Sequence, residues 1–89
     1  MRERDIEKYL VDRVAAMGGI AYKFTSPQRV NVPDRIVVMP GGRLVFVELK
    51  APGCLPNPGQ VREHSRLRAL GQEVRVIDSL KGVEVLLDV

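Results

Sequence analysis

The apolar residues of the chain follow two spacings, one typical of helices and one typical of strands. Over residues 2–17 they recur every three or four positions, which predicts an amphipathic helix that the Gly18-Gly19 pair ends. Over residues 20–24 they alternate, which predicts a strand with Tyr22 and Phe24 on one face. The chain is therefore expected to begin with a helix followed by a strand.

Two short apolar runs in the middle of the chain predict a β-hairpin. They cover residues 36–39 and 44–47, and a Pro-Gly-Gly-Arg segment separates them. Pro33 has no N–H to give to a sheet, so it suits the position where the first of these strands starts. Residues 25–32, which precede it, contain turn-forming and polar residues and predict a loop.

The second half of the chain predicts a loop, a helix, a strand and a short final helix. Three prolines make residues 51–59 a loop, and Gly71 ends a helix predicted over residues 60–70. Residues 73–78 predict a fourth strand, and Ser79 is a suitable N-cap for the last helix. The intervening helix allows the fourth strand to run parallel to a neighbour. We therefore expect an α/β chain of the α+β type, with helices packed on one mixed sheet.

Length and composition favour a single small domain over residues 1–89. An apolar content of 45% is typical of a folded protein, and the net charge of +3 is explained more simply by solubility than by a polyanionic partner. Cys54 is the only cysteine, which excludes an internal disulfide and fits a cytoplasmic protein. No apolar run approaches the roughly 20 residues that span a bilayer, so no membrane partner is expected.

Charged residues gather at one end of the predicted hairpin. Folding the hairpin about its glycine pair brings Asp34 level with Glu48, to within a residue. Glu48 and Lys50 point to one face of their strand, and Leu49 points the other way into apolar packing, because side chains alternate along a strand. Charges in such a place are costly unless they are paired or hold a metal ion.

Four further polar side chains are candidates for the same site, and each also has an ordinary explanation. Glu7 falls near the apolar stripe of the first helix, where a glutamate at the rim of the core is common. Lys23 lies on the strand that neighbours the hairpin, where a solvent-facing lysine is just as expected. Gln60 and His64 share the stripe of the second helix that faces the sheet, where a polar core-edge residue and a hydrogen-bonded core histidine are the alternatives.

These residue types suit metal-dependent hydrolysis. Asp34, Glu48 and Glu7 supply the hard oxygen ligands that Mg²⁺ prefers, and the main-chain carbonyl of Leu49 is a further candidate ligand. Lys50 could hold or deprotonate a water molecule, or neutralise a phosphate in the transition state. A cation that activates water while it binds a phosphate oxygen would support hydrolysis of a phosphodiester without an organic cofactor.

An acid and a lysine two residues apart are common at the ends of strands and are weak evidence for a catalytic site. A Pro-Asp pair before one strand, combined with an acid and a lysine that close the next strand, is much more specific. Pro33-Asp34 and Glu48-Leu49-Lys50 resemble the PD-(D/E)xK nuclease signature. More narrowly, nearly the whole chain resembles the VRR-NUC domain, the virus-type replication–repair nuclease. The matching positions are Glu7, Gly18-Gly19, Lys23, Pro33-Asp34-Arg35, residues 46–53, Gln60 and residues 67–71.

The resemblance implies a restriction-endonuclease-like fold and DNA cleavage with Mg²⁺ or Mn²⁺. By position, the catalytic and metal-binding residues would be Asp34, Glu48, Leu49 through its carbonyl, Lys50, Glu7 and Gln60. Stand-alone members occur in bacteriophages and prophages, are similar to Holliday junction resolvases and act as homodimers. The implied partner is therefore branched DNA in the cytoplasm of a bacterial host.

The residues that we expect to contact DNA are Lys23, Ser26, Arg29 and Arg35. One departure from the family pattern precedes the Pro-Asp pair, where Asn31 stands in place of a frequent glycine. Asparagine tolerates a positive φ better than most residues, so the turn can persist.

Two other classes of function are open from the sequence. One is a DNA-binding or assembly module that retains the fold without catalysis, and the other is a small domain with incidental charges. Every charged position expected of the nuclease is filled, which favours the enzyme.

Overall fold

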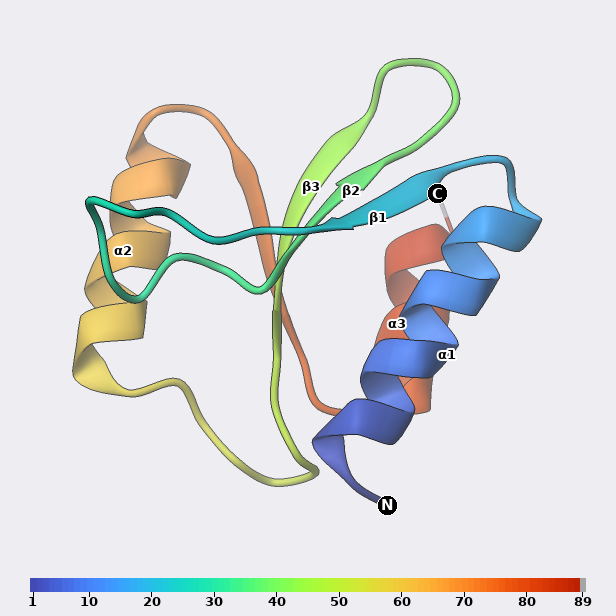
Figure 1. Ribbon diagram of the computed structural model, residues 1–89, viewed down its shortest axis with the longest axis horizontal. Coiled ribbons are helices and arrows are strands. Elements are labelled where there is room, and N and C mark those ends of the chain that lie inside the picture. The colour runs from blue at the N-terminus through green and yellow to red at the C-terminus, as the bar shows by residue number, and fades with distance from the viewer. Residues whose placement is uncertain (89) are drawn as a thin grey trace.

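In the computed structural model, which describes residues 1–88, three helices and a four-stranded sheet form three layers (Figure 1). The elements in chain order are α1 (Glu3–Ala16), β1 (Ile20–Lys23), β2 (Arg35–Val38), β3 (Leu44–Leu49), α2 (Pro58–Ala69), β4 (Glu73–Ile77) and α3 (Leu80–Leu87). Each predicted element is present, and the expected α+β fold is confirmed. No helix within this range is long and apolar enough to cross a membrane.

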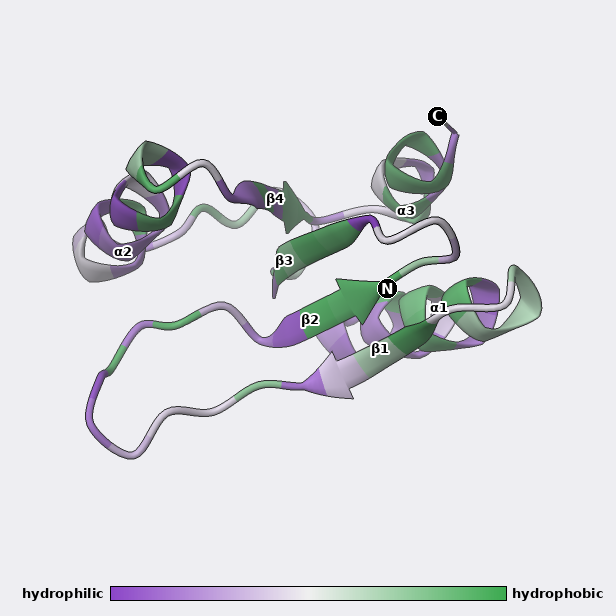
Figure 2. Cartoon of the chain, turned by 90° about the horizontal axis from the view of Figure 1, so that it is seen from above, coloured by the Kyte–Doolittle hydropathy of each residue, from purple (hydrophilic) through white to green (hydrophobic). Residues whose placement is uncertain are grey.

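The strands pair in the order β1-β2-β3-β4, and the predicted mixed sheet is confirmed. β2 runs antiparallel to both β1 and β3, whereas β4 runs parallel to β3. The helix α2 connects β3 to β4 and returns the chain to the same end of the sheet, as parallel pairing requires. The helices α1 and α3 cover one face of the sheet, and α2 lies on the other (Figure 2).

The core lies between the sheet and the two helices α1 and α3. Its buried apolar side chains are Ile6, Leu10, Val14, Val37, Val45, Val47, Leu49, Ile77, Val83, Leu86 and Leu87. Burying each of them stabilises the fold by about 1.5–3 kcal/mol relative to leaving it exposed. The alternation along the strands sends Leu49 into this core, as predicted, and therefore sends its neighbours Glu48 and Lys50 to the opposite face.

The helix α2 begins two residues earlier than the sequence pattern predicted. Asn57 is its N-cap, and Pro58 takes the first helical position, where its missing N–H is not needed. The side chain of Asn57 accepts a hydrogen bond from the Gln60 N–H at 2.9 Å, and the Gln60 Oε1 accepts one from the Asn57 N–H at 2.9 Å. This reciprocal pair of hydrogen bonds is a capping box, and it stabilises a helix start within the segment that the sequence predicted to be loop.

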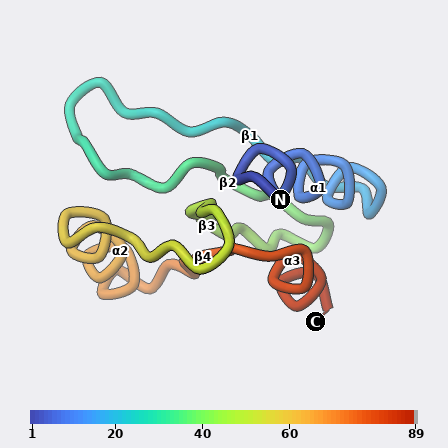
Figure 3. Tube along the Cα trace, turned by 90° about the horizontal axis from the view of Figure 1, so that it is seen from below, coloured from blue at the N-terminus to red at the C-terminus, as the bar shows by residue number. Residues whose placement is uncertain are grey.

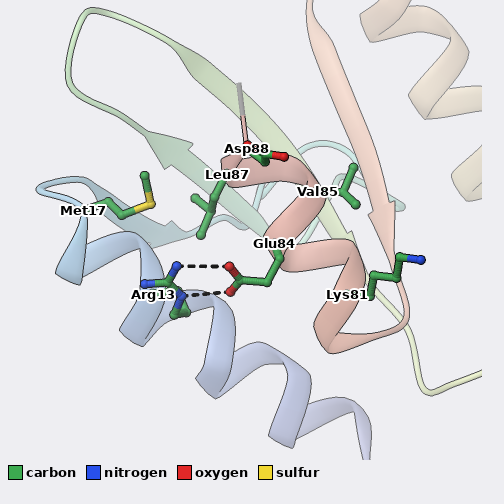
Figure 4. Close-up of a pocket in the computed structure, with 7 residues that line it drawn as sticks. All are labelled: Arg13, Met17, Lys81, Glu84, Val85, Leu87 and Asp88. Atoms are coloured by element: carbon green, nitrogen blue, oxygen red, sulfur yellow. Dashed lines mark hydrogen bonds and ion pairs between the residues drawn. The ribbon is translucent and has the colours of Figure 1, made fainter.

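A polar cluster ties α1 to α3 on the far side of the sheet from α2. The Arg13 guanidinium donates to both carboxylate oxygens of Glu84, at 2.8 and 3.0 Å, and the Tyr9 hydroxyl donates to the same carboxylate at 2.7 Å. A cavity of about 430 Å³ opens beside this pair (Figure 4). Arg13 and then Tyr9, as hydrogen-bond donors, hold the pKa of Glu84 down to about 2. The cluster orients two helices that otherwise meet through apolar side chains.

We expect Glu84→Gln to lower the thermal unfolding midpoint at pH 7, because the variant loses the charge that Arg13 binds. The folded-state pKa of Glu84 lies below its usual 4.5, so its stabilising contribution is present above pH 4.5 and is lost as the pH falls through about 2. Thermal unfolding followed by circular dichroism from pH 7 to pH 2 should therefore show that the difference in midpoint between the variant and wild type decreases as the pH falls. Asp12→Asn is the control, since its ion pair with Lys8 is exposed. A difference that stays constant with pH would contradict the assignment.

Candidate active site

The register of the hairpin brings Asp34 opposite Glu48. Arg35 pairs with Val47, so the next residue on each strand extends the same antiparallel pairing. The Leu49 N–H donates to the Asp34 Oδ2 at 2.8 Å, and the main-chain carbonyl of Asp34 accepts from the Phe24 N–H at 2.9 Å. Asp34 is therefore held by both neighbouring strands, and the predicted juxtaposition of the two acids is confirmed.

Glu48 is the buried centre of this cluster, with only 2% of its surface exposed. Its Oε2 accepts a hydrogen bond from the Gln60 Nε2 at 3.1 Å and lies 3.9 Å from the Lys50 Nζ. Its Oε1 lies 3.5 Å from the His64 Nε2, yet within residues 1–88 neither of these two atoms has a hydrogen-bond partner. The predicted inward stripe of α2, Gln60 with His64, therefore does face the charged end of β3.

The cluster shifts the ionisation of its members. The pKa of Glu48 is raised to about 7, first by burial and then by the negative charge of Asp34, while Lys50 opposes the rise. The pKa of His64 is lowered, first by burial and then by the positive charges of Arg68 and Lys50. His64 is therefore neutral at pH 7, and Glu48 carries only part of its charge.

The chemistry of these donors fits a hard divalent cation. No group of three or more His, Cys, Asp or Glu side chains suited to a metal occurs in the described part of the chain. Mg²⁺, however, is commonly held by one or two carboxylates together with water molecules. Asp34 and Glu48 could supply those two carboxylates, and the unpaired, buried Oε1 of Glu48 is an oxygen that a cation would satisfy.

Comparisons with known proteins give the family of the chain. No family model matches it. A solved structure described as a VRR_NUC domain superimposes with a TM-score of 0.90 at 38% sequence identity, over 97% of this chain and 94% of that one. A protein of Acyrthosiphon pisum secondary endosymbiont phage 1, named "Putative nuclease p44", is 60% identical over 79 residues, which are 89% of this chain and 85% of that protein. The chain belongs to the VRR-NUC family. Its restriction-endonuclease-like fold, inferred from sequence motifs, is thereby confirmed.

The first-helix acid of this VRR-NUC chain is placed differently from the sequence-based interpretation. Glu7 is half-buried between α1 and the sheet, as expected, but its Oε2 accepts a hydrogen bond from the Arg35 Nε at 3.0 Å. The Arg35 Nη1 also donates to the Ala21 carbonyl at 3.0 Å, so its guanidinium links α1 to β1. Glu3, one helical turn earlier and exposed, is the α1 acid whose charge helps to raise the pKa of Glu48. Glu3 and Glu7 are four residues apart and lie on one stripe of α1. This spacing was the one feature of the sequence that could have indicated Glu3 as a second candidate.

The other candidate contacts to DNA are spread over two faces of the VRR-NUC domain. Lys23 pairs with Arg35 across the β1–β2 ladder, so its side chain lies on the face opposite to Glu48 and Lys50. Ser26 and Arg29 lie in the loop between β1 and β2, and Arg29 is paired with a glutamate of α2 at 3.1 Å. The structure does not bring these three residues to the carboxylates, and their contacts with DNA stay predictions.

Asn31 has a φ of 67°, so the turn before the Pro-Asp pair adopts the left-handed conformation that glycine would favour. The expectation that asparagine preserves this turn is confirmed, because its short polar side chain tolerates a positive φ.

We expect the metal-free protein to lose stability between pH 5 and pH 8 on account of Glu48. A carboxyl whose pKa is raised from 4.5 to about 7 favours the fold below pH 4.5, and this contribution is lost as the pH rises through 7. Glu48→Gln keeps the hydrogen bond from Gln60 without ionising, so it should exceed wild type at pH 8 by on the order of 1–3 kcal/mol.

Chemical denaturation in the presence of a chelator measures this difference. Glu73→Gln is the control of opposite sign, because hydrogen bonds from Arg43 lower the pKa of Glu73, and its loss should destabilise the protein above pH 4.5. Parallel pH profiles for wild type and Glu48→Gln would show that Glu48 is not buried in this way.

Proposed function

We propose that the chain is an endodeoxyribonuclease that hydrolyses phosphodiester bonds with Mg²⁺ or Mn²⁺, cuts branched DNA such as Holliday junctions, and acts as a homodimer. The observation that carries the catalytic part is the buried Glu48, with one unpaired oxygen, beside Asp34, Lys50 and Gln60. Membership of the VRR-NUC family and the phage relative named as a nuclease support the same conclusion. Burying an acid in this way is costly for stability alone, and it is useful where the acid binds a cation.

Each polar residue of the cluster has a distinct part in the proposed reaction. When bound, a divalent cation makes water a better nucleophile and neutralises charge on a phosphate. Asp34 and Glu48 would hold the cation, and the Leu49 main-chain carbonyl would be a further candidate ligand. Lys50, whose Nζ lies 3.9 Å from the Glu48 Oε2, would stabilise negative charge on the reacting phosphate as the ammonium, or would take a proton from water as the neutral amine.

The Gln60 side chain positions Glu48. Its Oε1 is engaged in the capping box of α2, so the amide can present only its Nε2 to the Glu48 Oε2. The side chain thus joins the start of the helix to the carboxylate that faces it. We place Gln60 among the site residues for this reason, and we assign it no proton transfer.

We expect Asp34→Asn, Glu48→Gln and Lys50→Ala each to reduce cleavage on the order of 10²-fold or more, because each removes a charge needed in the transition state. The assay titrates Mg²⁺ or Mn²⁺ into protein with labelled four-way junction, flap, splayed and linear duplex DNA. Asp12→Asn and Lys8→Ala are matched controls, since within residues 1–88 these exposed side chains pair only with each other on α1.

Three outcomes separate the possibilities. Metal-dependent product that requires all three residues supports the enzyme, and a preference for the junction supports branched DNA as substrate. Robust cutting by folded Asp34→Asn or Glu48→Gln would contradict the site. A shifted but uncut DNA band with every metal would instead support a binding module.

An exposed apolar surface supports the proposed homodimer. Ile20, Val38 and Leu44 are neighbours on adjacent strands and lie on one face of the sheet, where they are 53%, 37% and 40% exposed. Tyr22, which is 55% exposed, extends this apolar patch along β1. On this face of β1 and β2 the described strand residues carry no charge, so two copies can meet without like-charge repulsion. A two-fold contact through this patch would give the two catalytic sites that a four-way junction needs.

Replacing Ile20 by glutamate should weaken dimerisation by more than tenfold, because two copies would bring carboxylates into an apolar contact. Val85→Glu on α3 is the matched control, since Val85 is also 53% exposed but lies on the other face of the sheet. Analytical ultracentrifugation measures the dimer, and the junction assay should show single nicks in place of paired cuts. A dimer unaffected by Ile20→Glu would rule out this face as the interface.

A further inference from the structure

A basic cavity lies between the loop that joins β1 to β2 and the outer side of α2. The loop and the helix extend on the same side of the sheet, away from α1 and α3 (Figures 2 and 3). The cavity between them has a volume of about 330 Å³. Its charged lining residues are Arg29 from the loop and Arg62, Glu63 and Arg66 from α2. We call these four residues the arginine pocket.

The charges of the arginine pocket do not balance. Three guanidinium groups and one carboxylate leave an excess of two positive charges. Glu63 is only 8% exposed, and its Oε1 lies 3.1 Å from the Arg29 Nη2 and 3.5 Å from the Arg66 Nε. Arginine has five N–H donors, so Arg29 and Arg66 retain donors for an anion after binding Glu63. Arg62 has no ion-pair partner within residues 1–88.

The pocket is built by close packing of the loop on the helix. Asn31, with its positive φ, places its side chain against Gly59 at the start of α2. A Cβ at position 59 would lie 2.5 Å from the Asn31 Nδ2, so any larger residue would displace the Asn31 side chain. The Arg29–Glu63 ion pair spans the same gap one helical turn later. Two separate contacts therefore fix the loop on the helix, and the ion pair restrains the Arg29 guanidinium, which reduces the entropy that anion binding would cost there.

The arginine pocket and the candidate active site share the beginning of α2. Gly59 lines the pocket, and the next residue, Gln60, donates to Glu48. Arg62 lies only about 3 Å beyond Gln60 along the helix axis, but it lies about 200° around a helix that is about 10–12 Å wide with its side chains. Successive phosphates of one DNA strand advance by about 3.4 Å along the duplex axis. A phosphate in the pocket and one held at Glu48 are therefore separated by about the width of the helix, which corresponds to roughly three or more nucleotides.

We propose that the arginine pocket binds a non-reacting phosphate of the same DNA molecule and thereby sets which phosphodiester reaches Asp34 and Glu48. The proposal rests on the proposed nuclease function. Guanidinium groups match phosphate oxygens in pairs, and phosphate contacts fix the position of a protein along a strand. Arg29 alone is enough to neutralise the buried Glu63 and to attach the loop to α2. The other two arginines of the pocket therefore are not needed for that attachment.

Arg62→Ala is the decisive variant because Arg62 does not bind Glu63 and its loss leaves no buried charge unpaired. Binding of labelled four-way junction DNA is measured by fluorescence anisotropy in a chelator, from 50 to 200 mM NaCl, with the full chain. We expect roughly 5- to 20-fold weaker binding and a salt slope that is smaller by about one. Arg62→Lys should fall between, since it keeps the charge but loses the paired donors. Lys81→Ala on α3 is the control.

A second measurement locates the contact. Single uncharged methylphosphonates are placed on either side of the cut site, and we expect one position within a few nucleotides to weaken wild-type binding but not that of Arg62→Ala. At saturating DNA and metal, the cut sites of Arg62→Ala should spread over neighbouring phosphodiesters, whereas those of Lys81→Ala should match wild type. Arg66→Ala serves as a repeat of the test from the next turn of α2.

The two hypotheses fail in different ways. Wild-type protein that binds DNA but never cuts it overturns the proposed nuclease and not the phosphate contact, because binding is measured without metal. Protein that cuts DNA while Arg62→Ala and Lys81→Ala bind alike, with equal salt slopes, overturns the arginine pocket. A uniform effect of every methylphosphonate in both proteins would also overturn it, since it would indicate charge without position.

Discussion

The burial of one carboxylate, Glu48, governs how β3 and the start of α2 meet. The strand β3 sends its alternate residues into the main core, and the alternation leaves an acid facing α2 with almost no contact with water. Such a group must find donors, a counter-charge or a proton. Gln60 supplies a donor and Lys50 a charge at 3.9 Å, and burial together with Asp34 raises the pKa of Glu48 to about 7, so the carboxyl is partly protonated at neutral pH when no cation is bound.

The start of α2 connects this local problem to the fold. The capping box that begins the helix uses one end of the Gln60 amide, and Glu48 uses the other. A single side chain thereby fixes where the helix begins and how the carboxylate is oriented. The next helical turn presents Arg62 and Arg66 to the loop before β2, so a change in the start of α2 would move both surfaces together.

The two faces of the sheet carry different kinds of residue. The face covered by α1 and α3 holds the main apolar core and the Arg13–Glu84 pair, which orients the two helices. The other face holds the acids at one end and the exposed apolar patch around Ile20 at the other. This division explains why an 89-residue chain can keep a core and still present two kinds of surface.

Patterns in the sequence were enough to predict the elements, the hairpin register and the meeting of Asp34 with Glu48. These features depend on short-range rules: the glycine-containing turn sets the register, and strand alternation sets the face. The positive φ of Asn31 followed from the same kind of rule. Three features depend instead on long-range packing: Glu7 binds Arg35, the charge of Glu3 contributes to the raised pKa of Glu48, and Arg62 and Arg66 line a cavity. The wheel of α2 placed both arginines away from the sheet, but it could not show that a loop from residues 25–34 folds against them. Such contacts join segments that are some 30 residues apart, and their choice depends on the packing of the whole chain rather than on local spacing.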